Sequence, residues 1–258
     1  MNDPIQGFYD SLAPYYHLIF ADWDATIERQ AGVLNALLGS ELRAGSLTIH
    51  DCACGIGTQA IALAQSGHQV LGSDLSAAAV ERARLEAKHR GVAVSFFVSD
   101  MTQLAEVEGS FDVVLALDNA LPHLSPAEIN NAVTAMSKKL RPGGLLLAST
   151  RDYDTLISER PTVQGPSFYG NHGERRIVHQ VWDWIDRERY ILHMYITRQT
   201  DGQWESHHFV SEYRCVQRDE LSRALASSGM EAIRWLMPGE SGFFQPMVVA
   251  RKPGAFEA

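Results

Sequence analysis

The sequence predicts an α/β fold with a doubly wound, mostly parallel, seven-stranded sheet. Three observations support this prediction. Short apolar segments alternate with amphipathic helical patterns between residues 47 and 149. The first of these segments is followed by a glycine-bearing turn and a helix, which is typical of a nucleoside-binding unit. After residue 151 the pattern changes to period-two alternation, which predicts an antiparallel insert.

The elements of the first half follow in a regular order. Residues 8–39 read as two helical pieces, the first of which is interrupted by Pro14. Gly67 closes the helix after the first strand, and Ser76 can cap the helix after the second. A turn at residues 141–144 leads into the fifth strand. The predicted strands of this half are 47–51, 69–73, 92–98, 111–117 and 145–149.

The second half adds an insert and then completes the sheet. Residues 175–186, 190–198 and 203–216 alternate with period two and form an antiparallel β-meander. A helix at 218–229 precedes two final strands, 232–236 and 244–251. Their short connection cannot be a crossover, so the last strand runs antiparallel to its neighbour. The predicted units are an N-terminal helical lid (1–40), a ligand-binding core (41–150), the insert (151–216) and the C-terminal part of the core sheet (217–258).

Composition excludes several classes of function. The chain has 22 basic and 31 acidic residues, a net charge of −9, and no basic cluster that could bind nucleic acid. Its three cysteines form neither a disulfide framework nor a zinc pattern, so no metal is expected. No secretory leader and no apolar run of about 18 residues occurs. These features predict a soluble, cytoplasmic protein without a membrane partner.

The turn after the first strand carries the binding chemistry. Gly55 and Gly57 allow the backbone to approach a ligand closely, and Asp74 can accept hydrogen bonds from two ribose hydroxyls. The same glycine pattern fits NAD. However, the carboxylate of Asp51 would repel a pyrophosphate seated on the following helix. S-adenosylmethionine has no phosphate and carries two cationic groups, so Asp51 favours this ligand over NAD.

The whole chain resembles the class I S-adenosylmethionine-dependent methyltransferases, whose Rossmann-like sheet is parallel with one antiparallel terminal strand. The segment from Asp51 to Gly57 is similar to their first motif, with Ala53 where the fullest form has glycine. The resemblance implies that Asp74 binds the ribose. It further implies donor contacts from Asp51, Ala53, Gly55 and Gly57 in the turn, from Leu75, Asp100 and Met101 around the adenine, and from Leu117 beneath the methionine portion.

A closer resemblance is to the glycine N-methyltransferases, above all the bacterial glycine/sarcosine methyltransferases. The segments LDNALPHL (117–124) and RDYD (151–154) carry it, together with the opening FYDSLAPYYHLIFADW and the closing PGESGFFQPMVVARK. The resemblance implies that Asn119 and Arg151 hold the amino-acid substrate and that His123 lies near the cofactor. It also implies a tyrosine that reaches into the site, for which the candidates are Tyr9, Tyr15 and Tyr16, with Tyr9 preferred.

Each candidate also has a purely structural interpretation. Arg151 can bind a substrate carboxylate with two parallel hydrogen bonds, or it can pair with Asp152 or Asp154. Asn119 can bind substrate or form a turn, and His123 can relay a proton or hold a loop. Residues of the N-terminal helices can contact the donor from a lid or only pack within it; these are Tyr16, Trp23 and Arg29.

The expected function is S-adenosylmethionine-dependent methylation of a small molecule, with the nitrogen of glycine, sarcosine or a similar small amine as the acceptor. A first alternative is N- or O-methylation of a larger biosynthetic molecule, such as a heteroaromatic natural-product intermediate. A second is a regulator that binds the donor without turnover. The sequence leaves the acceptor, the number of methyl groups and the oligomeric state open, and a homo-oligomer is compatible with it. Aromatic residues of the insert fit the larger acceptor; they are Trp182, Trp184, Tyr190, Tyr195 and Tyr213.

Overall fold

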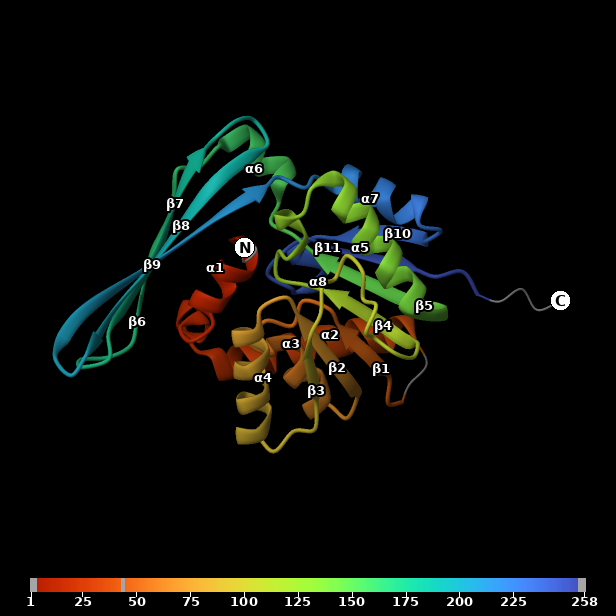
Figure 1. The fold of residues 1–258 in the computed structure, drawn as a ribbon, viewed down its shortest axis with the longest axis horizontal. Coiled ribbons are helices and arrows are strands. Elements are labelled where there is room, and N and C mark those ends of the chain that lie inside the picture. Colours follow the sequence, from red (N-terminus) through yellow and green to blue (C-terminus); the bar gives the residue numbers. More distant parts are fainter. Residues whose placement is uncertain (1–3, 43–44, 255–258) are drawn as a thin grey trace.

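The core of the protein is a seven-stranded sheet, shown in Figure 1 for the computed structural model, which describes residues 4–42 and 45–254. Its strand order is β10-β11-β5-β4-β1-β2-β3. Neighbouring strands are parallel except at β11, which is antiparallel to both β5 and β10. The predicted fold class is therefore confirmed. The strands are β1 (Thr48–Asp51), β2 (Gln69–Asp74), β3 (Ser95–Val98), β4 (Phe111–Ala116), β5 (Leu140–Ser149), β10 (Glu231–Leu236) and β11 (Met247–Arg251).

Helices cover both faces of this sheet and bury two apolar layers. The predicted cap is present, because the Ser76 hydroxyl caps α4. Ser125 and Glu128 form a capping box at the start of α5. Burial of each large aliphatic side chain contributes roughly 1.5–3 kcal/mol to stability. One face carries α2 (Trp23–Glu41), α3 (Thr58–Gln65) and α4 (Ala77–His89), and the other carries α5 (Pro126–Lys139) and α7 (Arg218–Ser227). The short α8 (Pro238–Ser241) connects β10 to β11.

The residues between β5 and α7 form a second, antiparallel sheet that projects from one end of the core (Figure 1). Its order is β6-β7-β8-β9. The sequence predicts β7, β8 and β9 but misses helix α6 and the edge strand β6. Most of β6 is exposed without regular alternation, so it gives no period-two signal. The elements are α6 (Tyr153–Glu159), β6 (Val163–Tyr169), β7 (Arg176–Trp184), β8 (Arg189–Thr200) and β9 (Gln203–Arg214).

The N-terminal segment lies between the two sheets (Figure 1). It consists of α1 (Pro4–Leu12) and the short 3-10 helix η1 (Tyr16–Ile19). Phe8 and Leu12 of α1 belong to the apolar cluster of the second sheet. Arg176 of β7 donates hydrogen bonds to the carbonyls of Leu18 and Phe20. The N-terminal segment is therefore attached to the insert by both apolar packing and hydrogen bonds.

The start of β5 differs from the prediction. The sequence predicts a turn at 141–144, whereas the strand already begins at Leu140. Leu140 pairs with Phe111 and Leu145 pairs with Val113, so residues 141–144 stand opposite Asp112 alone. The predicted turn is therefore present as an irregularity inside the strand, comparable to a bulge.

Gly72 in β2 occupies a position with no room for a side chain. A Cβ there would lie 2.5 Å from the Phe96 ring and 3.3 Å from the Cys54 Cβ. Gly72→Ala is therefore expected to lower the free energy of unfolding by about 1–2 kcal/mol through overpacking. The control is Gly39→Ala in α2, where nothing lies within 4 Å of the added Cβ, and it should gain about 0.5–1 kcal/mol. Urea denaturation measures both, and equal stability of the two variants would contradict the tight packing.

Candidate active site

The turn between β1 and α3 brings backbone donors and a carboxylate together at the carboxyl end of the sheet. Gly55 and Gly57 have φ angles of +52° and +94°, which favour glycine. The Gly55 N–H donates to Asp74 Oδ2 at 2.8 Å, and the Ser76 N–H donates to Asp74 Oδ1 at 2.9 Å. Asp74 is therefore fixed at the end of β2, beside the turn.

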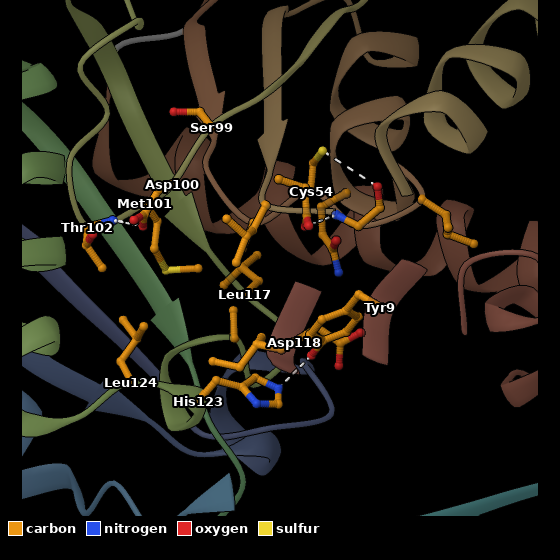
Figure 2. A pocket seen from close by; sticks show the side chains of 18 of the residues that line it. Tyr9, Cys54, Ser99, Asp100, Met101, Thr102, Leu117, Asp118, His123 and Leu124 are labelled. Carbon is orange, nitrogen blue, oxygen red and sulfur yellow. Dashed lines mark hydrogen bonds between the residues drawn. The ribbon is translucent and has the colours of Figure 1, made fainter. Parts of the chain in front are cut away.

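A cavity of about 120 Å³ opens against this turn, and we call it the turn cavity. In Figure 2, Leu117 lies near its centre, with Asp100 and Met101 on one side and Tyr9 on the other. Most of the residues expected to contact the donor line this cavity. They are Tyr16, Ala53, Gly55, Asp74, Leu75, Asp100, Met101, Leu117 and His123.

Asp51 and Gly57 are not among the residues that line the turn cavity. Asp51 is buried, and its Oδ2 has no hydrogen-bond partner among the described residues. Burial raises the pKa of Asp51 to about 7, although the Ala53 N–H acts in the opposite direction. A cationic ligand beside the turn would favour the ionised carboxylate. The residues present therefore fit a ligand with a sulfonium and an ammonium group, such as S-adenosylmethionine.

The structure does not bring Trp23 and Arg29 to the turn cavity. Arg29 is exposed on α2 and is absent from the cavity lining. Trp23 is buried, its indole N–H donates to Thr58 Oγ1 at 3.0 Å, and the Arg90 guanidinium lies over its ring. Trp23 thus supports the start of α3 behind the turn. Neither residue lines the turn cavity in this structure, so donor contact from Trp23 and Arg29 stays a prediction that the cavity lining does not support.

A second cavity, of about 330 Å³, lies between α1, the end of β4 and the insert sheet, and we call it the insert cavity. Three side chains line both cavities: Tyr9, Tyr16 and Asp118. The two cavities therefore adjoin at these residues. The insert cavity also has polar residues, including Asn119, Arg151, Gln180 and Tyr213, and apolar residues, including Phe8, Leu12, Ile19, Phe20, Val178, Met194 and Phe244.

Arg151 reaches the insert cavity from the end of β5. Its guanidinium donates to the Tyr190 hydroxyl at 2.7 Å and to Gln180 Oε1 at 3.3 Å. It also lies over the rings of Trp182 and Tyr213, at 4.8 Å and 5.4 Å from their centroids. All of these contacts are with neutral groups of the insert. Trp182, Tyr190 and Tyr213 thus form a stacked aromatic wall behind the guanidinium.

The neighbouring acids do not neutralise Arg151. Asp152 and Asp154 form ion pairs with Arg218 instead, at 2.8 Å and 3.3 Å. Within the described residues, no acidic group lies at ion-pair distance from Arg151. A cation whose direct contacts are all neutral, in the lining of a cavity, would be stabilised by an anionic ligand.

The backbone after β4 is left-handed at two successive residues. Asp118 and Asn119 have φ angles of +57° and +65°. The Asp118 N–H donates to Ser149 Oγ at 2.8 Å, and the Arg151 N–H donates to Asn119 Oδ1 at 3.0 Å. Asn119 Nδ2 has no partner in the described part of the chain. Asn119 therefore holds the loop, as its structural interpretation predicts, and also leaves an unpaired donor group in the lining of the insert cavity.

Tyr9 and His123 form a hydrogen-bonded pair, with 2.8 Å between Tyr9 Oη and His123 Nε2 (Figure 2). His123 ends the short 3-10 helix η2 (Leu121–His123). Burial lowers the pKa of His123 to about 4, and burial raises the pKa of Tyr9 well above its usual value. Both groups are therefore neutral at pH 7.

The three competing tyrosines of the N-terminal segment have different positions. Tyr9 and Tyr16 line both cavities, and the Tyr16 hydroxyl donates to Asp118 Oδ2 at 3.0 Å. Tyr15 lines neither cavity and packs on His207 of β9, with 3.9 Å between ring centroids. Tyr9 and Tyr16 thus border the cavities and Tyr15 does not, which supports the preference for Tyr9 over Tyr15.

Asp118 is the candidate that the sequence interpretation misses. It belongs to the LDNALPHL segment, in which the resemblance assigns roles only to Asn119 and His123 beside Leu117. A usable signal exists, because Asp118 stands at the carboxyl end of a predicted strand, as Asp51 and Asp74 do. The same rule would have selected it. Other residues of the turn cavity, such as Thr58, Gln59 and Ser99, carry no such signal.

Two further expectations concern metal and membrane. Among residues 4–42 and 45–254, no group of three or more His, Cys, Asp or Glu side chains could hold a metal ion. His208 Nε2 lies 3.0 Å from His193 Nδ1, whereas the His207 ring packs against Tyr15. These two adjacent histidines of β9 therefore point to opposite faces of the sheet. No helix of the described chain has both the length and the apolar content needed to cross a membrane.

Comparison with known proteins identifies the central segment. Residues 49–144 match the family described as "Methyltransferase domain". This segment contains the glycine turn, Asp74 and the end of β4. It therefore includes most of the lining of the turn cavity.

Two named relatives and one solved structure extend the comparison. The chain is 28% identical over 184 residues to the ubiquinone biosynthesis O-methyltransferase of Chelativorans sp. (strain BNC1), across 71% of this chain and 58% of that protein. It is 23% identical over 188 residues to the glycine/sarcosine N-methyltransferase of Halorhodospira halochloris, across 69% of each. CalS10, an amino pentose methyltransferase from Micromonospora echinaspora solved with bound S-adenosylmethionine, has a TM-score of 0.71 at 21% identity. That match covers 88% of this chain and 91% of CalS10, and it shows the same fold.

Proposed function

We propose that this chain, a class I S-adenosylmethionine-dependent methyltransferase, methylates the nitrogen of a small amine that carries a carboxylate. Glycine and sarcosine are the first candidates. The observation that supports this proposal is Arg151, a guanidinium with no acid at ion-pair distance among the described residues, in the cavity that adjoins the turn cavity. A carboxylate matches the fork of a guanidinium with two parallel hydrogen bonds. A glycine/sarcosine N-methyltransferase among the relatives adds support.

The turn cavity would hold the donor, which supplies an electrophilic methyl group on its sulfonium. Asp74 would accept hydrogen bonds from the ribose hydroxyls, and Asp51 would balance the cationic groups from behind the turn. Leu75 and Met101 would flank the adenine, with Asp100 at its amino group. All of these residues except Asp51 line the turn cavity.

The N-terminal segment would act as a lid over this site. The turn cavity, at about 120 Å³, is smaller than the roughly 300–1,000 Å³ typical of sites for drug-sized ligands. α1 and η1 contribute Tyr9 and Tyr16 to its border and are not part of the core sheet. A displacement of this segment would widen the cavity for the donor, and its return would exclude water.

Catalysis would depend mainly on positioning. The amine lone pair attacks the methyl carbon in line, and the C–S bond breaks as the C–N bond forms. Arg151 and Asn119 would hold the acceptor at the mouth of the turn cavity. The neutral Tyr9–His123 pair would hydrogen-bond the amine and orient its lone pair. A water-excluded site favours this step, because charge disperses as the sulfonium is consumed.

An acceptor panel tests the proposal. Transfer of labelled methyl groups to glycine, sarcosine and dimethylglycine is measured against uncharged amines and hydroxylated heterocycles. Turnover of glycine or sarcosine, without turnover of the uncharged amines, is the expected result. Methylation of hydroxyl groups alone would contradict the proposal. Tight donor binding without turnover of any acceptor would favour the alternative of a regulator.

A larger amine or hydroxylated intermediate is the second candidate acceptor. The insert cavity, at about 330 Å³, falls within the range of sites for drug-sized ligands and has a substantial apolar lining. Glycine would leave much of this volume to water. A preference for amines with an apolar group over glycine, in the same panel, would support this candidate.

Methyl transfer should be independent of divalent metal. Displacement at a sulfonium needs no Lewis acid, and the described residues present no metal-binding group of side chains. Incubation with EDTA followed by gel filtration is expected to leave the initial rate unchanged. A rate abolished by this treatment and restored by magnesium or zinc would contradict the expectation.

A further inference from the structure

The junction of the two cavities is where the methyl group has to pass from donor to acceptor. Tyr9, Tyr16 and Asp118 line both cavities. With the donor in the turn cavity and the acceptor in the insert cavity, the nucleophile must approach the methyl carbon beside these side chains. Figure 2 shows Tyr9, Asp118 and His123 gathered at this end of the turn cavity.

The backbone holds Asp118 at the junction in an unfavourable conformation. Its φ of +57°, followed by +65° at Asn119, lies in the left-handed region, which few residues with a Cβ adopt. Hydrogen bonds from the two backbone N–H groups to Ser149 Oγ and to the Ser149 carbonyl maintain this conformation. Strained backbone of this kind is concentrated at functional sites. The position of the Asp118 carboxylate is therefore a built feature of the loop.

The other polar groups at the junction cannot take up a proton near pH 7. Burial raises the pKa values of Tyr9 and Tyr16, so both remain phenols. Burial lowers the pKa of His123 to about 4, and its Nε2 is engaged with Tyr9. Asp118 Oδ2 accepts a hydrogen bond from the Tyr16 hydroxyl, and no hydrogen bond to Asp118 Oδ1 is found among the described residues. Burial raises the pKa of this carboxyl, while Tyr16 and then Arg151 act in the opposite direction.

A basic amine meets two obstacles at this junction. Aliphatic amines are mostly protonated near pH 7, and an ammonium group has no lone pair for attack. A cationic acceptor would also be repelled by the cationic sulfonium. A carboxylate at the junction removes both obstacles. Its negative charge attracts the ammonium group, and it is a base that can accept a proton from that group.

We propose that Asp118 is a catalytic residue that binds the acceptor in its ammonium form and accepts a proton from it before methyl transfer. This inference rests on the proposed function, since it requires an amine acceptor. An N–H bond of the ammonium breaks and an O–H bond forms on Asp118. The freed lone pair forms the N–CH₃ bond, and the electron pair of the broken C–S bond stays on sulfur. The product leaves as the methylated ammonium, and Asp118 releases its proton to water, so each turnover liberates one proton.

The test compares Asp118→Asn with the wild type on two acceptors that both carry a carboxylate. Sarcosine has a strongly basic amine, whereas aminooxyacetate has a weakly basic amino group that is unprotonated near pH 7. Asp118→Asn is expected to lower kcat/KM for sarcosine by about 100-fold or more and for aminooxyacetate by only a few-fold. The loss on sarcosine should shrink as the pH rises and free amine becomes available.

The controls separate this role from others. Asp201→Asn replaces an acid with the same left-handed backbone, φ +52°, in the exposed β8–β9 turn, and should change neither rate. Calorimetry with S-adenosylmethionine and with its demethylated product should give wild-type affinities for Asp118→Asn. A selective loss of affinity for the sulfonium form would assign Asp118 to the donor and overturn the inference. Equal losses on both acceptors would overturn it as well.

The wild type provides a measurement that does not depend on the variant. If Asp118 accepts the proton, kcat/KM for sarcosine should be nearly constant across pH values above the pKa of Asp118 and below that of the amine. A tenfold rise of kcat/KM for each pH unit, up to the pKa of the amine, would show that the free amine is the bound species. That result would overturn this inference and leave the proposed function intact. Failure of the wild type to methylate any amine would overturn the proposed function, and this inference with it.

Discussion

Arg151→Lys is expected to lower kcat/KM for a carboxylate-bearing amine by roughly 30- to 700-fold, which corresponds to about 2–4 kcal/mol. The guanidinium is held by Tyr190 and Gln180 and stacks on Trp182 and Tyr213, so its orientation in the insert cavity is fixed. A lysine ammonium presents no planar fork and cannot give a carboxylate two parallel hydrogen bonds. Steady-state methyl transfer to sarcosine measures the effect.

Donor affinity should not change in this variant, because Arg151 does not line the turn cavity. Arg189→Lys is the matched control, since Arg189 is an exposed arginine of the same sheet and pairs with Asp186 and Glu212. Its turnover should equal that of the wild type. Normal methylation of the acceptor by Arg151→Lys would exclude a carboxylate at this position, although the methyltransferase assignment would survive.

Asp74→Ala is expected to weaken donor binding by about 2–4 kcal/mol, or roughly 30- to 700-fold in Kd. Two contributions add. The ribose hydroxyls lose a charged acceptor, and the N–H groups of Gly55 and Ser76 lose their partner, which loosens the turn. Calorimetric titration with S-adenosylmethionine and its demethylated product measures the change.

The control for Asp74→Ala is Asp219→Ala, which removes an exposed acid of α7 that pairs with Arg223. Its donor affinity should match that of the wild type. NAD should bind to neither the wild type nor the variants, because the Asp51 carboxylate opposes a pyrophosphate at this turn. Unchanged donor affinity in Asp74→Ala would remove Asp74 from the ribose site.

The core sheet was predictable because its signals are local. Each strand of the core is a short apolar segment with a turn or cap signal next to it, and Ser76 begins a helix as its sequence context predicts. The direction of β11 followed from the length of one connection. Strand β6 was missed because an exposed edge strand needs no apolar alternation.

The parts of the candidate site that lie close together in the sequence were predictable, and the parts that are distant in the sequence were not. Asp74 and Gly55 lie within one strand-turn-helix-strand unit, so a motif identifies them. The surroundings of Arg151 come from β7, β8 and β9, and no spacing rule places Tyr190 or Trp182 against a residue some 30–40 positions away. The exposure of Arg29 shows what helical periodicity leaves open. The periodicity predicts which side chains share one face of α2, but it does not predict which part of the protein that face contacts.

The two cavities are lined by residues from different parts of the chain. Apart from Ile5, Tyr9 and Tyr16, the turn cavity is lined by residues between 53 and 128. The insert cavity takes only Asp118 and Asn119 from residues 49–144, the segment shared with the methyltransferase domain family, and the rest from the N-terminal segment, the insert and the chain near β11. The segment that matches the family therefore carries information about the donor and very little about the acceptor. An O-methyltransferase and an N-methyltransferase are both among the relatives of this chain. Substitutions in the lining of the insert cavity can change the acceptor and leave the donor site untouched.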